Sequence, residues 1–382
     1  MASQEKKNSI AYSLADQNFA RAKSVGIFNV SMDLLHTLAT NPQCPPLTVL
    51  ANSSLRDNLK LPQSARTIFQ DTAIRGRLGR MWWDQVAVYS AARRAGSDWL
   101  LLPKGFASFA RRCPVRLAPL VHDVLQDHYD RHYPTEVSKA ETLYFRASLK
   151  ASLEQAEVIF TPTEFTSREI QRMARGRGWP VPPLVYCGEG FERPAAKPRT
   201  ERRDIVVLAS RFPYKLTRQA VDFFSRWVRE YPFKETVHWI GSLPPKFEMP
   251  ALPQFRWHPR LAEKEFRELM GAARVVAFTS EYEGFGRPPV EAVLAGACPV
   301  FSDIPATREV MNGAGCPFTN GNYESFAAAI RSSLSVTPAQ LEAWSQELMR
   351  RHNWSLVVDR VLEALRLNRD EHSKSAQPAL TD

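Results

Sequence analysis

Short apolar runs alternate with longer stretches of helical periodicity along most of this chain of 382 residues. Each run has the length of a strand, and the order strand, helix, strand is typical of parallel sheets. One ordinary hydrophobic core does not enclose a chain of this length, whereas two domains of roughly 150 to 200 residues do. The sequence therefore predicts an α/β protein with two doubly wound domains.

A segment rich in proline and charge at residues 193–203 divides the chain, and we expect it to be the linker. Before it, strands are expected at residues 10–14, 47–51, 66–70, 99–102, 116–121, 158–161 and 184–186, and a first helix at 28–39. After it, strands are expected at residues 205–209, 237–241, 275–279 and 298–301, and helices at 217–230 and 263–273. The predicted domains are residues 1–192 and 204–365, followed by a flexible polar tail at 366–382.

Composition narrows the class of protein. The hydrophobic share of 44% is that of a globular protein, and no segment approaches the roughly 18 uninterrupted apolar residues of a membrane span. Residues 1–9 are polar and lack the apolar core of a signal peptide. The five cysteines are scattered without any C-x-x-C pair, so neither a disulfide framework nor a zinc site is indicated. We expect a cytoplasmic protein with reduced cysteines.

The net charge of +10 is concentrated in one region, residues 74–116. Its cations are interleaved with aromatic residues such as Trp82 and Trp83, as on a surface that meets anionic lipid headgroups or an acidic acceptor. Two alternatives remain: a solvated basic face with the tryptophans in the core, and a nucleic-acid surface, for which no recognised binding motif is present. The basic residues are Arg75, Arg77, Arg80, Arg93, Arg94, Lys104, Arg111, Arg112 and Arg116, against Asp84 and Asp98.

The stretch Glu283-Gly284-Phe285-Gly286-Arg287-Pro288-Pro289-Val290-Glu291 carries the clearest functional signal. Its glycines let a ligand approach the backbone closely, and its prolines pre-set the first turn of a helix. A helix N-terminus carries partial positive charge and suits a phosphate. Glu291, in the opening turns of that helix, would accept hydrogen bonds from hydroxyls such as those of a ribose.

This stretch and its continuation resemble the donor-site signature of retaining glycosyltransferase family 4. The resemblance rests on residues 278–286, Pro288, Glu291-Ala292, residues 296–300, and Ser302-Asp303-Ile304-Pro305-Ala306 through Glu309-Val310. It covers the second half of the chain and is thinner in the first. The resemblance implies the GT-B fold, in which two Rossmann-like domains face an interdomain cleft. Residues 1–192 would then bind the acceptor, and residues 204–365 the nucleotide-sugar donor.

Arg211 and Lys215 follow the first expected strand of the second domain, where ligands of doubly wound sheets bind. The planar donor fork of arginine and the point charge of lysine can together neutralise a diphosphate. The resemblance implies that role for both residues. Glu283 is expected to accept hydrogen bonds from the donor sugar, and the N–H groups of Gly284, Phe285 and Gly286 to bind the diphosphate.

Three further positions are candidates mainly through the resemblance. His122 ends an expected strand, where the family holds a histidine against the donor sugar, although a structural histidine is the alternative. Gly26 resembles the family's glycine loop near acceptor and phosphate, but only Val25-Gly26 stands where the family has a fuller glycine pair, and a simple helix-start glycine is the alternative. Leu261 occupies the place where the family holds the base through backbone groups. His128 and His132 have one-turn spacing but no H-E-x-x-H motif, so no metal site is expected.

The sequence thus predicts transfer of a sugar from a nucleoside diphosphate sugar to a hydroxyl with retention and without metal or other cofactor. The catalytic set would be His122, Glu283, Arg211 and Lys215. The neighbourhood of Lys215 leans towards GDP-mannose or a related deoxyhexose donor, and the acceptor would be a glycan or lipid-linked molecule of bacterial surface polysaccharide or lipopolysaccharide. The alternatives are an epimerase or hydrolase of the same fold, a nucleic-acid-binding protein, and a non-catalytic sugar-nucleotide sensor.

Overall fold

The computed structural model describes residues 8–16, 25–70, 74, 76–193, 202–232 and 234–375. The chain forms two compact units, Met1–Gly190 with His352–Asp382, and Phe191–Arg351. Most of the linker expected at 193–203 lies outside the described residues, and the division falls slightly earlier, after Gly190. Within the described residues, no helix combines the length and apolar character that crossing a membrane requires.

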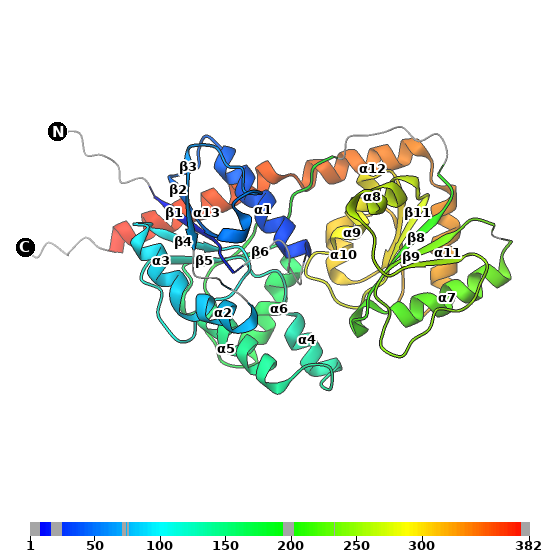
Figure 1. Cartoon of the computed structure of the whole chain (residues 1–382), viewed down its shortest axis with the longest axis horizontal. Coiled ribbons are helices and arrows are strands. Elements are labelled where there is room, and N and C mark those ends of the chain that lie inside the picture. Colours follow the sequence, from blue (N-terminus) through cyan, green and yellow to red (C-terminus); the bar gives the residue numbers. More distant parts are fainter. Residues whose placement is uncertain are drawn as a thin grey trace, which may run out of the picture. The chain divides into compact units, whose positions relative to one another are not determined.

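A parallel five-stranded sheet forms the centre of the first unit, in the order β3-β2-β1-β4-β5. The chain moves outward from β1 in one direction and then returns to place β4 on its other side, so the strand order reverses between β1 and β4 (Figure 1). The strands are β1 Ile10–Leu14, β2 Leu47–Asn52, β3 Ala65–Gln70, β4 Trp99–Leu102 and β5 Arg116–Pro119. The expected strands are confirmed here to within two residues at each end.

Strand β5 ends before the predicted residue 121 because the chain turns towards a separate parallel pair. Leu120 forms an isolated bridge with Phe160 in that pair, which consists of β6 (Ile159–Thr161) and β7 (Leu184–Tyr186). The helices of the first unit are α1 Val25–Thr40, α2 Gly76–Trp82, α3 Val88–Arg94, α4 Leu125–His132, α5 Lys139–Gln155, α6 Glu164–Arg175 and α13 Trp354–Ser375. A short turn η1 (Ser53–Leu55) follows β2, and a π-helical turn η2 (Trp83–Ala87) joins α2 to α3.

The last helix corrects the predicted domain boundaries. The prediction placed residues 352–365 in the second domain and treated 366–382 as a flexible tail. Helix α13 instead belongs to the first unit and continues to Ser375. Its apolar side chains, among them Trp354, Val358 and Leu362, are buried in the core that also contains Tyr12 of β1. Figure 1 shows α13, in orange to red, beside α1.

The second unit is built on a parallel six-stranded sheet in the order β10-β9-β8-β11-β12-β13. Here the strand order reverses between β8 and β11. The strands are β8 Ile205–Ala209, β9 Val237–Gly241, β10 Phe255–His258, β11 Val275–Phe278, β12 Cys298–Ser302 and β13 Cys316–Phe318. The sequence analysis missed β10 and β13, which are the two edge strands. Arg256 and Trp257 of β10 are exposed, and β13 contains Pro317, so neither reads as a buried apolar run.

Helices cover both faces of the second sheet. They are α7 Thr217–Glu230, α8 Glu263–Ala272, α9 Arg287–Leu294, α10 Pro305–Met311, α11 Tyr323–Ser335 and α12 Pro338–Arg351, with a 3₁₀ turn η3 at Pro213–Lys215. Helix α7 begins and ends where predicted, and its residue Phe224 stacks edge-on against Trp239 of β9 and Phe326 of α11. On the other face, Met270 and Ala273 pack with Val206 of β8.

Candidate functional site

Lys215 and Glu283 meet at the reversal point of the second sheet. Lys215 follows β8 and Glu283 follows β11, the two strands between which the order reverses. Loops at such a point diverge and leave room for a ligand beyond the carboxyl ends of the strands. The Lys215 Nζ atom lies 2.5 Å from Glu283 Oε1, and their side chains are 21% and 15% exposed. The two residues predicted to serve one donor site are thus brought into direct contact.

Two hydrogen bonds to backbone carbonyls hold the two loops against each other. The Thr279 hydroxyl donates to the Lys215 carbonyl at 2.7 Å, and the Glu281 N–H donates to the Tyr214 carbonyl at 2.8 Å. The ammonium group of Lys215 also lies 4.8 Å from the centre of the Phe278 ring, a cation–π contact. These contacts fix the lysine before any ligand arrives.

Gly286 is required by the geometry of the turn before α9. Its φ angle is +86°, and it forms the N-cap of the helix. A Cβ atom at this position would lie 3.0 Å from Cγ2 of Thr307. Helix α9 begins at Arg287, and Pro288 and Pro289 lie in its first turn, as the sequence predicted.

The side chains around this turn are engaged within the protein. Phe285 is 4% exposed and packs in a core cluster with Phe191, so any contact of Phe285 with a ligand would come from its backbone. Glu291 forms an ion pair with Arg287, with 3.1 Å between Oε1 and Nε, and its side chain is 44% exposed. The Arg287 guanidinium in turn lies 4.1 Å from the centre of the Phe191 ring.

Arg211 and Leu261 occupy the loops after β8 and β10. The Arg211 side chain is exposed and lies over the Phe212 ring at 5.2 Å, while its backbone N–H donates to the Ser242 hydroxyl. Leu261 is half-buried and packs against the cluster that includes Met270. The contact of the Leu261 backbone with a base, which the resemblance implies, stays a prediction.

His122 in the first unit has both ring nitrogens directed at protein groups. Nε2 lies 2.7 Å from the Pro103 carbonyl, which can only accept, so Nε2 carries a hydrogen. Nδ1 lies 3.7 Å from the carboxylate of Glu189, which is itself 5% exposed. Burial alone would lower the pKa of His122, but the hydrogen bond and charge of Glu189 outweigh it, and the pKa is raised.

These contacts favour a charged imidazolium held by Glu189. The sequence left open a histidine of the reaction and a structural histidine, and a ring held by Pro103 and Glu189 fits both. Sequence reasoning missed Glu189, because a glutamate between two glycines after a strand gives no sign of burial. The Asp123 carboxylate, next to His122, accepts a hydrogen bond from the Leu125 N–H at the start of α4.

Gly26 lies inside the first turn of α1 and not in a loop before it. The prediction placed the helix start at residue 28. A Cβ atom at Gly26 would meet no atom within 4 Å. Residues 17–24, which precede the helix, lie outside the described residues. Nothing in the described geometry requires glycine at this position.

A polar cluster at the reversal point of the first sheet escaped the sequence analysis. Asp16 follows β1, Lys104 follows β4, and Lys104 Nζ lies 2.5 Å from Asp16 Oδ2. Asp84 of η2 interacts electrostatically with both. The signal was available, because Asp16 and Lys104 each follow an expected strand by two residues. Lys104 was instead counted only as part of the basic region.

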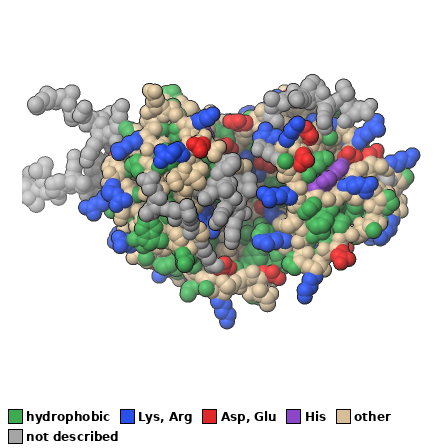
Figure 2. Space-filling view, viewed as in Figure 1, with side chains coloured by type: hydrophobic (Ala, Val, Ile, Leu, Met, Phe, Trp, Pro, Cys, Tyr) green, Lys and Arg blue, Asp and Glu red, His purple; other side chains and the backbone are tan. Residues whose placement is uncertain are grey.

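Some side chains of the basic region at 74–116 are paired or buried within the protein, and others are exposed. Lys104 is paired, and the Arg116 guanidinium lies over the Trp99 ring at 4.4 Å. One alternative for this region was a solvated basic face with both tryptophans in the core. Trp83 is buried as that alternative expected, but Trp82 is 49% exposed, and Leu78 is 80% exposed. Arg75 and the side chain of Arg77 lie outside the described residues. Figure 2 shows hydrophobic side chains near cations on this face of the first unit.

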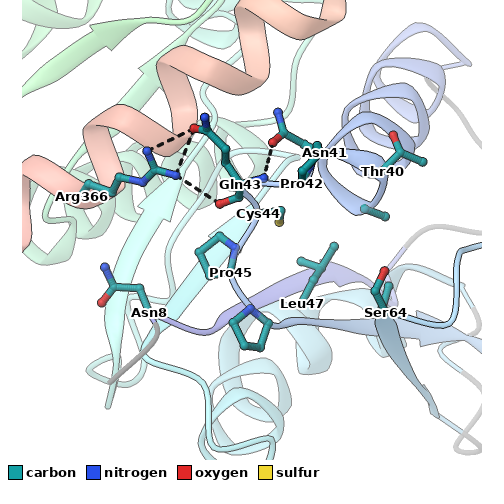
Figure 3. Close-up of a pocket in the computed structure, with 13 residues that line it drawn as sticks. Asn8, Thr40, Asn41, Pro42, Gln43, Cys44, Pro45, Leu47, Ser64 and Arg366 are labelled. Atoms are coloured by element: carbon teal, nitrogen blue, oxygen red, sulfur yellow. Dashed lines mark hydrogen bonds between the residues drawn. The ribbon is translucent and has the colours of Figure 1, made fainter. Parts of the chain in front are cut away.

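An open hollow of about 720 Å³ lies elsewhere on the first unit. Its lining includes Gln43 and the first residue of each of β2 and β3, Leu47 and Ala65. Figure 3 shows Arg366 of α13 donating to Gln43 at its edge. The hollow is at the amino ends of the strands, opposite the ends where doubly wound sheets bind ligands, so we do not assign it to the active site.

No group of three or more His, Cys, Asp or Glu side chains in the part of the chain that the structure describes could hold a metal ion. His128 and His132 stack with 4.5 Å between ring centres. All five cysteines are free thiols.

Comparison with solved structures defines the fold. Anabaena HepE in complex with UDP and glucose is 16% identical, with a TM-score of 0.64 over 94% of this chain and 99% of that one. Sucrose-phosphate synthase from Thermosynechococcus elongatus is 14% identical, with a TM-score of 0.66 over 97% and 100%. A UDP-forming trehalose-phosphate synthase from Burkholderia vietnamiensis is 12% identical, with a TM-score of 0.61 over 94% and 100%. The chain has the GT-B fold of these enzymes.

The second unit also matches a sequence family. Residues 203–335 match the family model described as glycosyl transferases group 1. A comparison with curated proteins found no match. The matched segment contains Lys215, Glu283 and Gly286. The family match and the fold together support a glycosyltransferase of the GT-B type.

Proposed function

We propose that this protein is a retaining glycosyltransferase of family 4 that transfers a sugar from a nucleoside diphosphate sugar to an acceptor hydroxyl. The observation that carries the proposal is the contact of Lys215 with Glu283 beside the Gly286 turn, at the reversal point of the matched unit. A cation, a carboxylate and a helix N-terminus meet there. A helix N-terminus binds the oxygens of a diphosphate, a carboxylate accepts hydrogen bonds from the hydroxyls of its sugar, and a cation stabilises the negative charge of the leaving group.

The proposed reaction makes one bond and breaks one bond on a single face of the sugar. The acceptor oxygen bonds to the anomeric carbon as the bond from that carbon to the diphosphate oxygen breaks. The departing phosphate takes the proton of the acceptor hydroxyl, so no protein nucleophile is needed. Lys215 and Arg211 stabilise the negative charge on the leaving diphosphate, and Glu283 accepts hydrogen bonds from the sugar.

The Lys215–Glu283 pair suits this role without rearrangement of the loops. Glu283 holds the ammonium group through one oxygen and retains further lone pairs for sugar hydroxyls. Glu291 is proposed to receive the ribose and the backbone near Leu261 to receive the base. His122 is proposed as a residue of the same reaction through the resemblance, with its ring held in place by Pro103 and Glu189.

The donor is proposed to be UDP-glucose, GDP-mannose or a related deoxyhexose nucleotide. HepE has been solved with UDP-glucose, which favours uridine, whereas the sequence around Lys215 favours the guanosine alternative. Thermal unfolding with a panel of such nucleotides tests the choice. A ligand at 100 times its dissociation constant adds about 2.7 kcal/mol of stability, which is readily measured. If no nucleotide sugar raises the melting temperature, the proposal fails.

The reaction is proposed to need no metal, because Arg211 and Lys215 supply the positive charge that a divalent cation would otherwise provide. Turnover should then be unchanged by EDTA. Retention is tested by the anomeric configuration of the product. Release of free sugar without acceptor would instead favour the hydrolase alternative.

The acceptor is proposed to be a glycan or lipid-linked molecule of bacterial surface polysaccharide or lipopolysaccharide. Leu78 and Trp82 lie one turn apart on α2 and are both exposed, and Arg80 lies between them in sequence. Exposed Phe109 is followed by the exposed cations Arg111 and Arg112. Apolar groups flanked by cations fit an anionic membrane surface. We therefore propose that the protein acts in the cytoplasm, where free cysteines persist, peripherally at the inner membrane face.

A further inference from the structure

The two sheets carry the same kind of ion pair at the same topological position. In the second unit, Lys215 and Glu283 follow the strands on either side of the reversal point. In the first unit, Asp16 and Lys104 do so. In both pairs the distance from ammonium nitrogen to carboxylate oxygen is 2.5 Å. Because ligands of doubly wound sheets bind at this point, the first pair marks a second candidate site.

The first pair is accessible on one side. The Lys104 side chain is 37% exposed, whereas that of Asp16 is 6% exposed. The lysine therefore faces solvent while the carboxylate beneath it is held in place. An incoming hydroxyl could accept a hydrogen bond from Lys104 and donate one to Asp16 without opening the core.

A π-helical turn brings a third side chain to the pair. The Trp83 indole N–H donates to the Ser13 hydroxyl at 3.2 Å, which ties η2 to β1. Gln85 donates to the Tyr144 hydroxyl at 3.1 Å, which ties the same turn to α5. Asp84 lies between these two anchors and interacts with Asp16 and Lys104. Single π-helical turns within α-helices are frequent at functional sites.

The charges of the cluster select the kind of ligand. Burial and the charge of Asp16 raise the pKa of Asp84 to about 8, although Lys104 and Arg80 act in the opposite direction. Tyr144 also faces Asp84 and is the remaining titratable neighbour on α5. The cluster therefore brings the Lys104 ammonium group and the Asp16 carboxylate, which are in direct contact, next to the carboxyl group of Asp84. Because the Asp16 carboxylate in contact with Lys104 repels an anion, the pair suits neutral hydroxyls better than a phosphate.

We propose that Asp16, Lys104 and Asp84 form a binding site for adjacent hydroxyls of a neutral sugar, the acceptor of the transfer reaction. That the bound sugar is the acceptor rests on the proposed function, whereas the site itself consists of residues of the first unit alone. Asp16 accepts from a hydroxyl and Lys104 donates to the same or the next one.

Saturation-transfer NMR tests this site with the full chain and the methyl glycosides of glucose, mannose and galactose as probes. A site of a few hydrogen bonds is expected to bind such probes at about 1 to 20 mM. The wild type should transfer saturation to at least one glycoside. Asp16→Asn and Lys104→Met should reduce that signal severalfold, and Lys104→Arg should retain part of it if Lys104→Met fails to fold. Lys60→Met, at an exposed lysine of the same unit, is the matched control.

The experiment separates this inference from the donor proposal. Lys215→Ala should abolish stabilisation by nucleotide sugars and leave the glycoside signal intact. Asp16→Asn should reduce the glycoside signal severalfold and leave stabilisation by nucleotide sugars intact. No glycoside signal in the wild type, or an equal signal in Asp16→Asn and Lys104→Met, overturns the second site. That result leaves the donor proposal to its own test.

Discussion

The ammonium nitrogen of Lys215 lies 2.5 Å from a carboxylate oxygen of Glu283, across the point where the strand order of the second sheet reverses. Neither side chain is fully buried, so the pair is not a core ion pair. Removing either partner leaves the other accessible to solvent, and we expect only a small change in folding stability. A pair of low structural value at a ligand-binding position is consistent with a role in binding.

The turn at Gly286 should tolerate no side chain. Gly286→Ala would place a Cβ atom at φ +86°, 3.0 Å from a methyl group of Thr307, at a cost of roughly 1 to 2 kcal/mol. Chemical denaturation measures the loss, and binding of nucleotide sugars should weaken with it. Gly271→Ala is the control, because Gly271 lies in α8 with open space around it. Equal effects of the two substitutions would contradict the strained-turn account.

Gly26→Ala tests the glycine-loop hypothesis for the first unit. Gly26 lies in α1 with open space around it, so alanine should be neutral or should stabilise by about 0.5 to 1 kcal/mol. Turnover should be unchanged. A large loss of turnover with unchanged stability would instead show that a ligand approaches the backbone there.

The His122–Glu189 pair should make stability depend on pH. Burial lowers the pKa of His122, but the hydrogen bond and charge of Glu189, helped by the Pro103 carbonyl and Asp123, raise it overall. A raised histidine pKa contributes stability that is complete below the unfolded value of about 6.5 and is lost as pH rises through the folded value. Glu189→Gln should therefore lower the melting temperature at about pH 6 and less so at about pH 8. A difference in melting temperature between Glu189→Gln and the wild type that widens as pH rises would contradict this assignment.

Asp84 should make the folded state less stable as pH rises, whereas an ordinary ion-paired carboxylate makes it more stable. Its pKa is raised from 3.8 to about 8, mainly by burial and then by Asp16. Between those values the folded state holds more protons than the unfolded state, so stability falls as pH rises across the window. Asp84→Asn should therefore gain stability relative to wild type from about pH 4 to pH 8. Asp57→Asn, at an exposed position, is the control, and a constant difference across the window would refute the raised pKa.

Exposed Trp82 should contribute to contact with anionic membranes. Sedimentation with vesicles of phosphatidylglycerol should capture the wild type, and vesicles of phosphatidylcholine should capture less. Trp82→Ser should reduce capture because it removes an exposed apolar group beside cations. Val181→Ser removes an exposed apolar residue outside the basic region and should have no effect. Equal capture of both variants would end the membrane proposal.

The sequence predicted those strands that are continuous apolar runs, because parallel strands covered on both faces must be apolar throughout. The edge strands β10 and β13 carry exposed or proline positions and lack that signal. The apolar face of α13 was visible, but an amphipathic helix fits either core, so periodicity alone could not assign Trp354 and Leu362 to the first unit.

The candidate site was predictable to the extent that strand ends predict ligand positions. That rule located Lys215 and Glu283, and applied evenly it would also have located Asp16 and Lys104. It could not show that His122 turns both ring nitrogens towards Pro103 and Glu189. Side-chain direction at a strand end depends on what the following segments pack against, which spacing does not encode.

The most direct test of the account is calorimetric titration of the wild type and Lys215→Ala with UDP and GDP. The account predicts saturable binding of at least one nucleotide to the wild type. Loss of the Lys215 charge should weaken it at least tenfold, about 1.4 kcal/mol, and turnover should fall by about two to three orders of magnitude. Lys264→Ala, at an exposed lysine of α8, should bind as the wild type does. Undiminished binding and turnover in a folded Lys215→Ala variant would contradict the account.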